Sequence, residues 1–103
     1  MTIDVLGTTY TIYYKPLTDL DGYCDKTTKE IVISTKDDNC NLGNFEIYQN
    51  KVLRHEIIHA FMFESGLAEN WEHMELGQEE TVIDWFAIQG LKIYKAWQQA
   101  NCI

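Results

Sequence analysis

The sequence predicts an α+β fold, in which a small N-terminal antiparallel sheet is followed by two long helices. β-branched and aromatic residues are concentrated in the first third of the chain, in segments such as "TTYTIYYK" and "KEIVIST". After the loop "KDDNCNLGN", apolar residues recur at helical spacing. At 103 residues the chain has the length of one domain. We therefore expect a single domain over 1–103, with strands in 1–35 and helices at 44–66 and 79–100.

The expected strands and helices have recognisable ends. Gly7 stands between "TIDVLG" and "TTYTIYYK" and is a turn candidate. Asn44 is a plausible N-cap for the first helix, and Gly66 stands where a helix end favours a left-handed residue. The second helix is indicated by a run of spaced apolar residues: Val82, Ile83, Phe86, Leu91, Tyr94 and Trp97.

The composition excludes some classes of partner. With 8 basic and 16 acidic residues the chain has a formal charge of −8, so we expect neither nucleic acid nor an anionic membrane as a partner. No apolar run approaches the ~18 residues of a membrane span, and no signal peptide is recognisable. The three cysteines, Cys24, Cys40 and Cys102, are odd in number and form no CxxC pair. We expect reduced thiols in the cytoplasm, with a zinc-ligating cysteine as the lesser alternative.

The stretch "RHEIIHAFMFESGL", residues 54–67, carries the main functional motif. His55 and His59 are four residues apart on one helical face, about 5–6 Å apart at Cβ, so both imidazoles can reach one ion. Zinc favours such neutral nitrogens at about 2.0–2.1 Å. Glu56 projects beside the pair, where it can act as the general base toward a metal-polarised water. The alternative is that the two histidines occupy an ordinary helix face.

A catalytic zinc site usually takes three protein ligands and leaves one position open. The segment "EETVIDWFA" offers Glu80 as the third ligand, after enough chain for a loop and a return. Asp84 follows on the same helical face and can accept the N–H of a ligating histidine. Glu79 is an alternative if the helix phase differs, and His73 is an auxiliary candidate, as a ligand or an oxyanion donor.

The segments "HEIIHAFMFESG" and "EETVIDWFA" together resemble the zincin metallopeptidases whose third zinc ligand is a glutamate. Within these, the chain is most similar to the compact ImmA/IrrE-type proteins common in phages, prophages and mobile elements. Their HExxH helix is followed by E-x-x-A-N-x-F-A on another helix. Glu80, Phe86 and Ala87 match this second motif, whereas Ile83 and Asp84 replace its alanine and asparagine.

This resemblance implies a minimal zincin-like fold that binds Zn²⁺ through His55, His59 and Glu80, with Glu56 as catalytic base. It also implies a protein or peptide substrate, lying beside an edge strand above the active-site helix. "KEIVIST" is our candidate for that strand, although Ile31 and Ile33 also suit a buried sheet core. Two functions follow: a zinc metallopeptidase, which by resemblance is phage- or prophage-encoded, or a non-catalytic zinc-binding regulatory or interaction module. The oligomeric state is left open.

Overall fold

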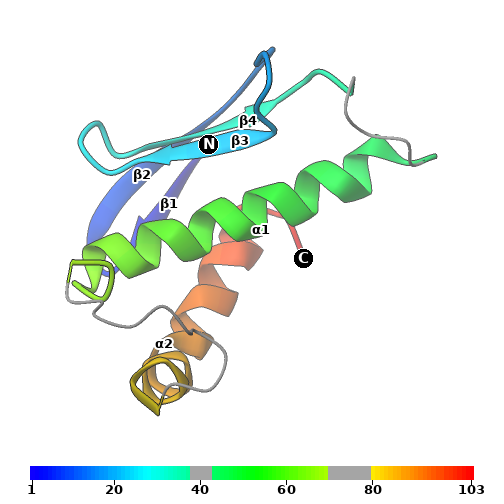
Figure 1. Ribbon diagram of the computed structural model, residues 1–103. Coiled ribbons are helices and arrows are strands. Elements are labelled where there is room, and N and C mark those ends of the chain that lie inside the picture. Colours follow the sequence, from blue (N-terminus) through cyan, green and yellow to red (C-terminus); the bar gives the residue numbers. More distant parts are fainter. Residues whose placement is uncertain (38–42, 70–79) are drawn as a thin grey trace.

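The computed structural model of the chain describes residues 1–37, 43–69 and 80–103. Within them a four-stranded sheet packs on two helices of 20 residues each, and both helices lie on the same side of the sheet (Figure 1). The elements in chain order are β1 (Thr2–Val5), β2 (Thr8–Lys15), β3 (Gly22–Asp25), β4 (Glu30–Ser34), α1 (Phe45–Glu64) and α2 (Glu80–Gln99). The α+β class with a sheet preceding two helices is confirmed.

The sheet is mixed, and the prediction of an antiparallel sheet is wrong for its central pair. The strand order is β1-β2-β4-β3, in which β1–β2 and β3–β4 are antiparallel pairs but β2 and β4 run parallel. The chain crosses over after β2, so the two hairpins meet through strands of the same direction. The alternation of apolar residues specifies which face each strand buries but not its partner, so this pairing is not readable from the sequence.

The turn between β1 and β2 is confirmed at Gly7. Leu6 and Gly7 both have positive φ, at 53° and 90°, as a two-residue turn of type I′ requires. The Gly7 N–H also donates to the Asp4 carboxylate at 3.0 Å, which closes the turn.

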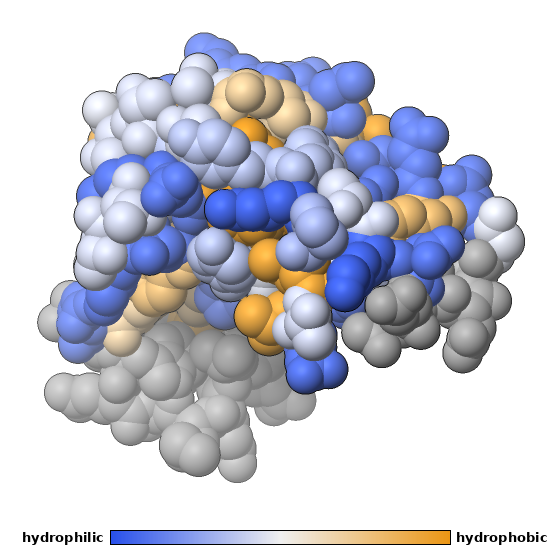
Figure 2. All heavy atoms as spheres, turned by 90° about the horizontal axis from the view of Figure 1, so that it is seen from above, coloured by the Kyte–Doolittle hydropathy of each residue, from blue (hydrophilic) through white to orange (hydrophobic). Residues whose placement is uncertain are grey.

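The core lies between one face of the sheet and the helices. Tyr10, Ile12, Ile31 and Ile33 line the sheet side, and Leu53, Ile57, Phe61, Ile93 and Ala96 cover it from the helices. The other sheet face, seen from above in Figure 2, is mainly hydrophilic with small apolar areas. Val32 points to that outer face yet is only 1% exposed, because Tyr13 and Tyr23 flank it on the neighbouring strands.

Both predicted ends of α1 are observed. The Asn44 side chain accepts a hydrogen bond from the Ile47 N–H, and Gly66 has a φ of +84° just beyond the helix. At the same end, the Trp85 indole N–H donates to the Ser65 hydroxyl at 2.8 Å and ties α2 to α1. Among the described residues, no helix combines the length and apolarity needed to cross a membrane.

The strand carrying "KEIVIST" is not at a sheet edge, which corrects our choice of a substrate-binding strand. β4 lies between β2 and β3, so Ile31 and Ile33 are core residues with no exposed area. The edge beside α1 belongs to β3 instead (Figure 1). β3 approaches α1 closely at Gly22, where a Cβ would lie 2.9 Å from the Val32 carbonyl oxygen and 3.0 Å from a Val52 methyl.

Candidate metal centre

The two motif histidines lie side by side on α1. The Nε2 atoms of His55 and His59 are 3.1 Å apart, and their rings meet edge to face with centroids 4.8 Å apart. Two nitrogens that share one tetrahedral zinc at about 2.0–2.1 Å are separated by roughly 3.3 Å. Both imidazoles therefore direct their Nε2 atoms toward each other, at nearly the separation that two nitrogen ligands of one zinc ion have.

The environment of His59 favours its neutral, metal-binding form. Burial lowers the pKa of His59 below its usual value, and the neighbouring charge of His55 lowers it further. A neutral imidazole has a lone pair for a metal, whereas the imidazolium has none. The 3.1 Å separation is also compatible with one N–H···N hydrogen bond between the rings when no ion is bound.

His59 is supported on its outer side by an aromatic ring. The Phe63 ring lies nearly parallel to the His59 imidazole, at 23° with centroids 6.2 Å apart. The Lys26 ammonium lies 5.2 Å from the Phe63 centroid and pairs with the Glu69 carboxylate at 2.7 Å. Of these groups, only the Phe63 ring lies next to the His59 imidazole.

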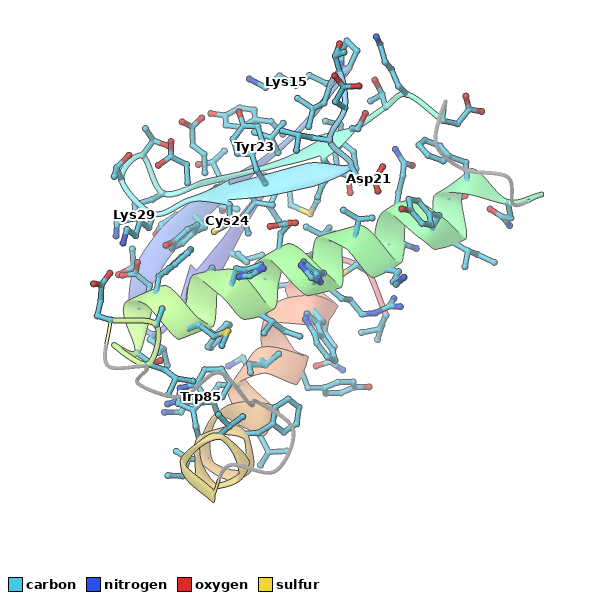
Figure 3. The ribbon with its side chains drawn as sticks, viewed as in Figure 1. Lys15, Asp21, Tyr23, Cys24, Lys29 and Trp85 are labelled. Carbon is cyan, nitrogen blue, oxygen red and sulfur yellow. The ribbon has the colours of Figure 1, made fainter. Side chains whose placement is uncertain are left out.

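Glu56 lies on the core-facing side of the same helix and is only 8% exposed. Burial raises the pKa of its carboxyl group, an effect that the nearby His55 partly opposes. The Cys24 side chain lies between β3 and α1 (Figure 3). Burial, with a further contribution from the Glu56 charge, raises the pKa of the Cys24 thiol to about 12, so this thiol is protonated at neutral pH.

A cavity of about 240 Å³ is lined by both Glu56 and His55. Both line it from α1. The other lining residues are Tyr48, Lys51 and Val52 of α1, Gly22 of β3 and Asp21, which immediately precedes β3. Asp21 lies above α1 (Figure 3). A molecule in this cavity would therefore contact Glu56, His55 and the sheet edge together.

The predicted third ligand is only partly described. Glu80 is the first residue of α2 and Asp84 lies in its second turn, but the side chains of both are outside the described residues. Glu79 and His73 lie wholly outside them. Among the side chains that are described, no group of three or more His, Cys, Asp or Glu residues could hold a metal ion. The described part thus contains a two-histidine half-site with a carboxylate beside it, which fits zinc in donor type and spacing.

Several residues of this region were not among our predictions. Lys51 and Phe63 stand four residues before His55 and four residues after His59, so helical spacing alone contained the signal for both. Gly22 carried no such signal, because its position depends on how β3 pairs and packs. For Cys24 the sequence predicted a reduced thiol or a zinc ligand, but not its place beside Glu56. No protein-family description, curated protein or solved structure matches the chain.

Proposed function

We propose that the chain is a minimal zincin-like, zinc-dependent metallopeptidase. His55 and His59 bind the zinc, Glu80 completes the ligand set, and Asp84 accepts the N–H of a ligating histidine. The observation that carries the proposal is the 3.1 Å separation of the two Nε2 atoms, with the buried Glu56 on the same cavity as His55. Two histidines on a purely solvated face would not need a buried carboxylate beside them.

Each side chain then has a defined task. When bound, zinc supplies Lewis acidity that polarises a carbonyl group and lowers the pKa of water towards ~7. The Glu56 carboxylate holds the proton removed from the attacking water and passes it to the leaving amine. Glu56 is largely buried but still lines the cavity, and Ala60 and Phe61, on the next turn of α1, fix the helix against the core.

The β3 edge supports a peptide as the substrate. The Ser34 N–H donates to the Asp21 carbonyl at 2.9 Å, so this opposed pair is hydrogen-bonded. Hydrogen-bonded and non-bonded pairs alternate along an antiparallel ladder, so the backbone N–H and C=O groups of Gly22 and Cys24 point away from β4. An extended peptide can add to this edge through those groups, beside the cavity that Glu56 lines.

The cytoplasm is the compartment that suits this proposal. Cys24 and Cys102, the cysteines within the described residues, are both free thiols. Free thiols are typical of a reducing compartment. We therefore propose a cytoplasmic protein or peptide as the substrate.

Metal analysis tests the ligand set directly. We expect about one zinc per purified chain, as for a single site of this type. His59→Ala and Glu80→Ala should lose it, whereas Glu56→Gln should retain it. Glu64→Gln is the matched control, because Glu64 lies on the same helix but is engaged by Lys29 and Tyr10.

The possible results distinguish a zinc metallopeptidase from a non-catalytic zinc-binding module and from a chain that binds no metal. A wild-type protein without zinc would reject the metal centre altogether. Full zinc content in Glu80→Ala would move the third ligand to Glu79 or His73, which the corresponding alanine variants would then identify. Zinc binding without any difference between wild type and Glu56→Gln in a peptide-library cleavage assay would favour the non-catalytic binding module.

A further inference from the structure

The cavity beside His55 contains one basic side chain, Lys51, to which the mechanism gives no task. We infer that this lysine selects substrates carrying a carboxylate close to the scissile bond, in an acidic side chain or at the peptide's C-terminus. The inference rests on the proposed peptidase function and names its substrate class.

Lys51 has the right position on the helix for this role. It precedes His55 by four residues, so the two side chains share one face of α1 at about 5–6 Å between Cβ atoms. Both line the cavity of about 240 Å³ together with Glu56. The flexible lysine stem can bring its ammonium to a substrate group bound next to His55.

Within the described part of the chain, the Lys51 ammonium has no carboxylate within ion-pair distance. The ion pairs there are Lys26–Glu69 and Lys29–Glu64. The Lys51 Nζ instead lies 5.8 Å from the centroid of the Tyr48 ring. In a chain with twice as many acidic as basic residues, an ammonium without an acidic partner at a site opening is available to an anionic ligand.

The acidic side chains at the same cavity are engaged differently. The Tyr48 hydroxyl donates to the Asp21 carboxylate at 2.5 Å, so Asp21 already has a strong donor. Tyr48 thus contacts both charges, with its ring toward Lys51 and its hydroxyl toward Asp21. Glu56 is buried, whereas Lys51 is exposed at the mouth, where an incoming group would meet it first.

Paired zinc-binding probes test this preference without a known substrate. We would titrate the zinc-loaded protein calorimetrically with succinic acid monohydroxamate and with its neutral amide and cationic aminoalkyl analogues. Wild type should bind the carboxylate probe roughly fivefold more tightly than the amide, the ratio for about 1 kcal/mol from one exposed ion pair. Lys51→Gln should remove this difference and Lys51→Glu should reverse it. Lys92→Gln, an exposed lysine on α2, is the control and should behave as wild type.

Binding of the neutral probe distinguishes a failure of the peptidase proposal from a failure of the substrate inference. If no probe binds to the zinc-loaded wild type, both the peptidase proposal and this inference fall. If the neutral probe binds but the carboxylate brings no gain, or the cationic probe binds most tightly, the substrate inference is overturned while the metal centre stands. An unchanged preference in Lys51→Gln would also overturn it.

Discussion

Two glutamates on the same face of α1 have opposite environments. Glu56 and Glu64 are eight residues apart, with Ala60 between them, and both are directed toward the sheet. Glu64 accepts hydrogen bonds from the Tyr10 hydroxyl at 2.7 Å and the Lys29 ammonium at 2.8 Å. None of the ion pairs in the described part of the chain includes Glu56.

This contrast appears in the titration of the two groups. The hydrogen bond from Lys29 is the largest influence that lowers the pKa of Glu64, whereas burial raises the pKa of Glu56. In turn, burial and the hydrogen bond to Glu64 raise the pKa of Tyr10. Glu64 is a structural carboxylate that its partners satisfy. Glu56 is largely buried and belongs to none of the ion pairs in the described part of the chain. A carboxyl group with a raised pKa beside two histidines is the arrangement that the proposed catalytic role requires.

The largest expected effect comes from removing the packing that both glutamates share. Phe61 is 1% exposed and packs beneath this face of α1. Phe61→Ala should lower the free energy of unfolding by about 3–5 kcal/mol, because a buried aromatic ring is replaced by a cavity. Urea denaturation followed by circular dichroism would measure it. A loss below about 1 kcal/mol would show that α1 is not anchored through Phe61.

Neutralising each glutamate separately should give changes of opposite sign. In the metal-free protein, Glu56→Gln should raise the free energy of unfolding by about 1 kcal/mol, because an unpaired buried charge is removed. Glu64→Gln should lower it by about 1 kcal/mol or less, because the charged hydrogen bond from Lys29 is lost. Denaturant midpoints at neutral pH measure both. Equal signs would remove the distinction between a functional and a structural carboxylate.

The smallest effect is expected in the acid dependence of stability. Because its pKa is lowered on folding, Glu64 stabilises the native state fully above its unfolded pKa of about 4.3. That stabilisation is lost as the pH falls through the lower, folded value. Thermal unfolding between pH 6 and 3, about the range of this transition, should therefore show a shallower decline in Glu64→Gln than in wild type. Parallel curves would show that the Lys29 contact does not persist in solution.

Local sequence information was sufficient to predict two helices after the sheet and the placement of the two motif histidines on one helix face. Asn44, Gly66 and the spacing of His55 and His59 act within one or two helical turns, and each lies as that spacing predicts. The burial of Glu56 was not predicted, because it depends on how α1 packs against the sheet.

The remaining features depend on contacts between distant segments. We predicted "KEIVIST" at the sheet edge, but its parallel pairing with β2 places it in the centre of the sheet. The residues of that segment do not specify which strands pair with it. The partners of Glu64 are equally non-local, since Tyr10 and Lys29 come from β2 and from the residue before β4. The ligand role of Glu80 stays a prediction, because its side chain is outside the described residues.

The close approach of β3 to α1 has a consequence for saturation mutagenesis. Any side chain at Gly22 would meet the Val32 carbonyl and Val52 and push the strand away from the helix. If the chain has the proposed activity, a screen for it would score Gly22 with His55 and Glu56, as a position at which substitutions reduce activity. Gly22 offers no side-chain chemistry, and its contribution is the missing Cβ that keeps the cleft narrow. If substitutions at Gly22 are not tolerated, the reason would be the short distance between β3 and α1 and not a reactive side chain.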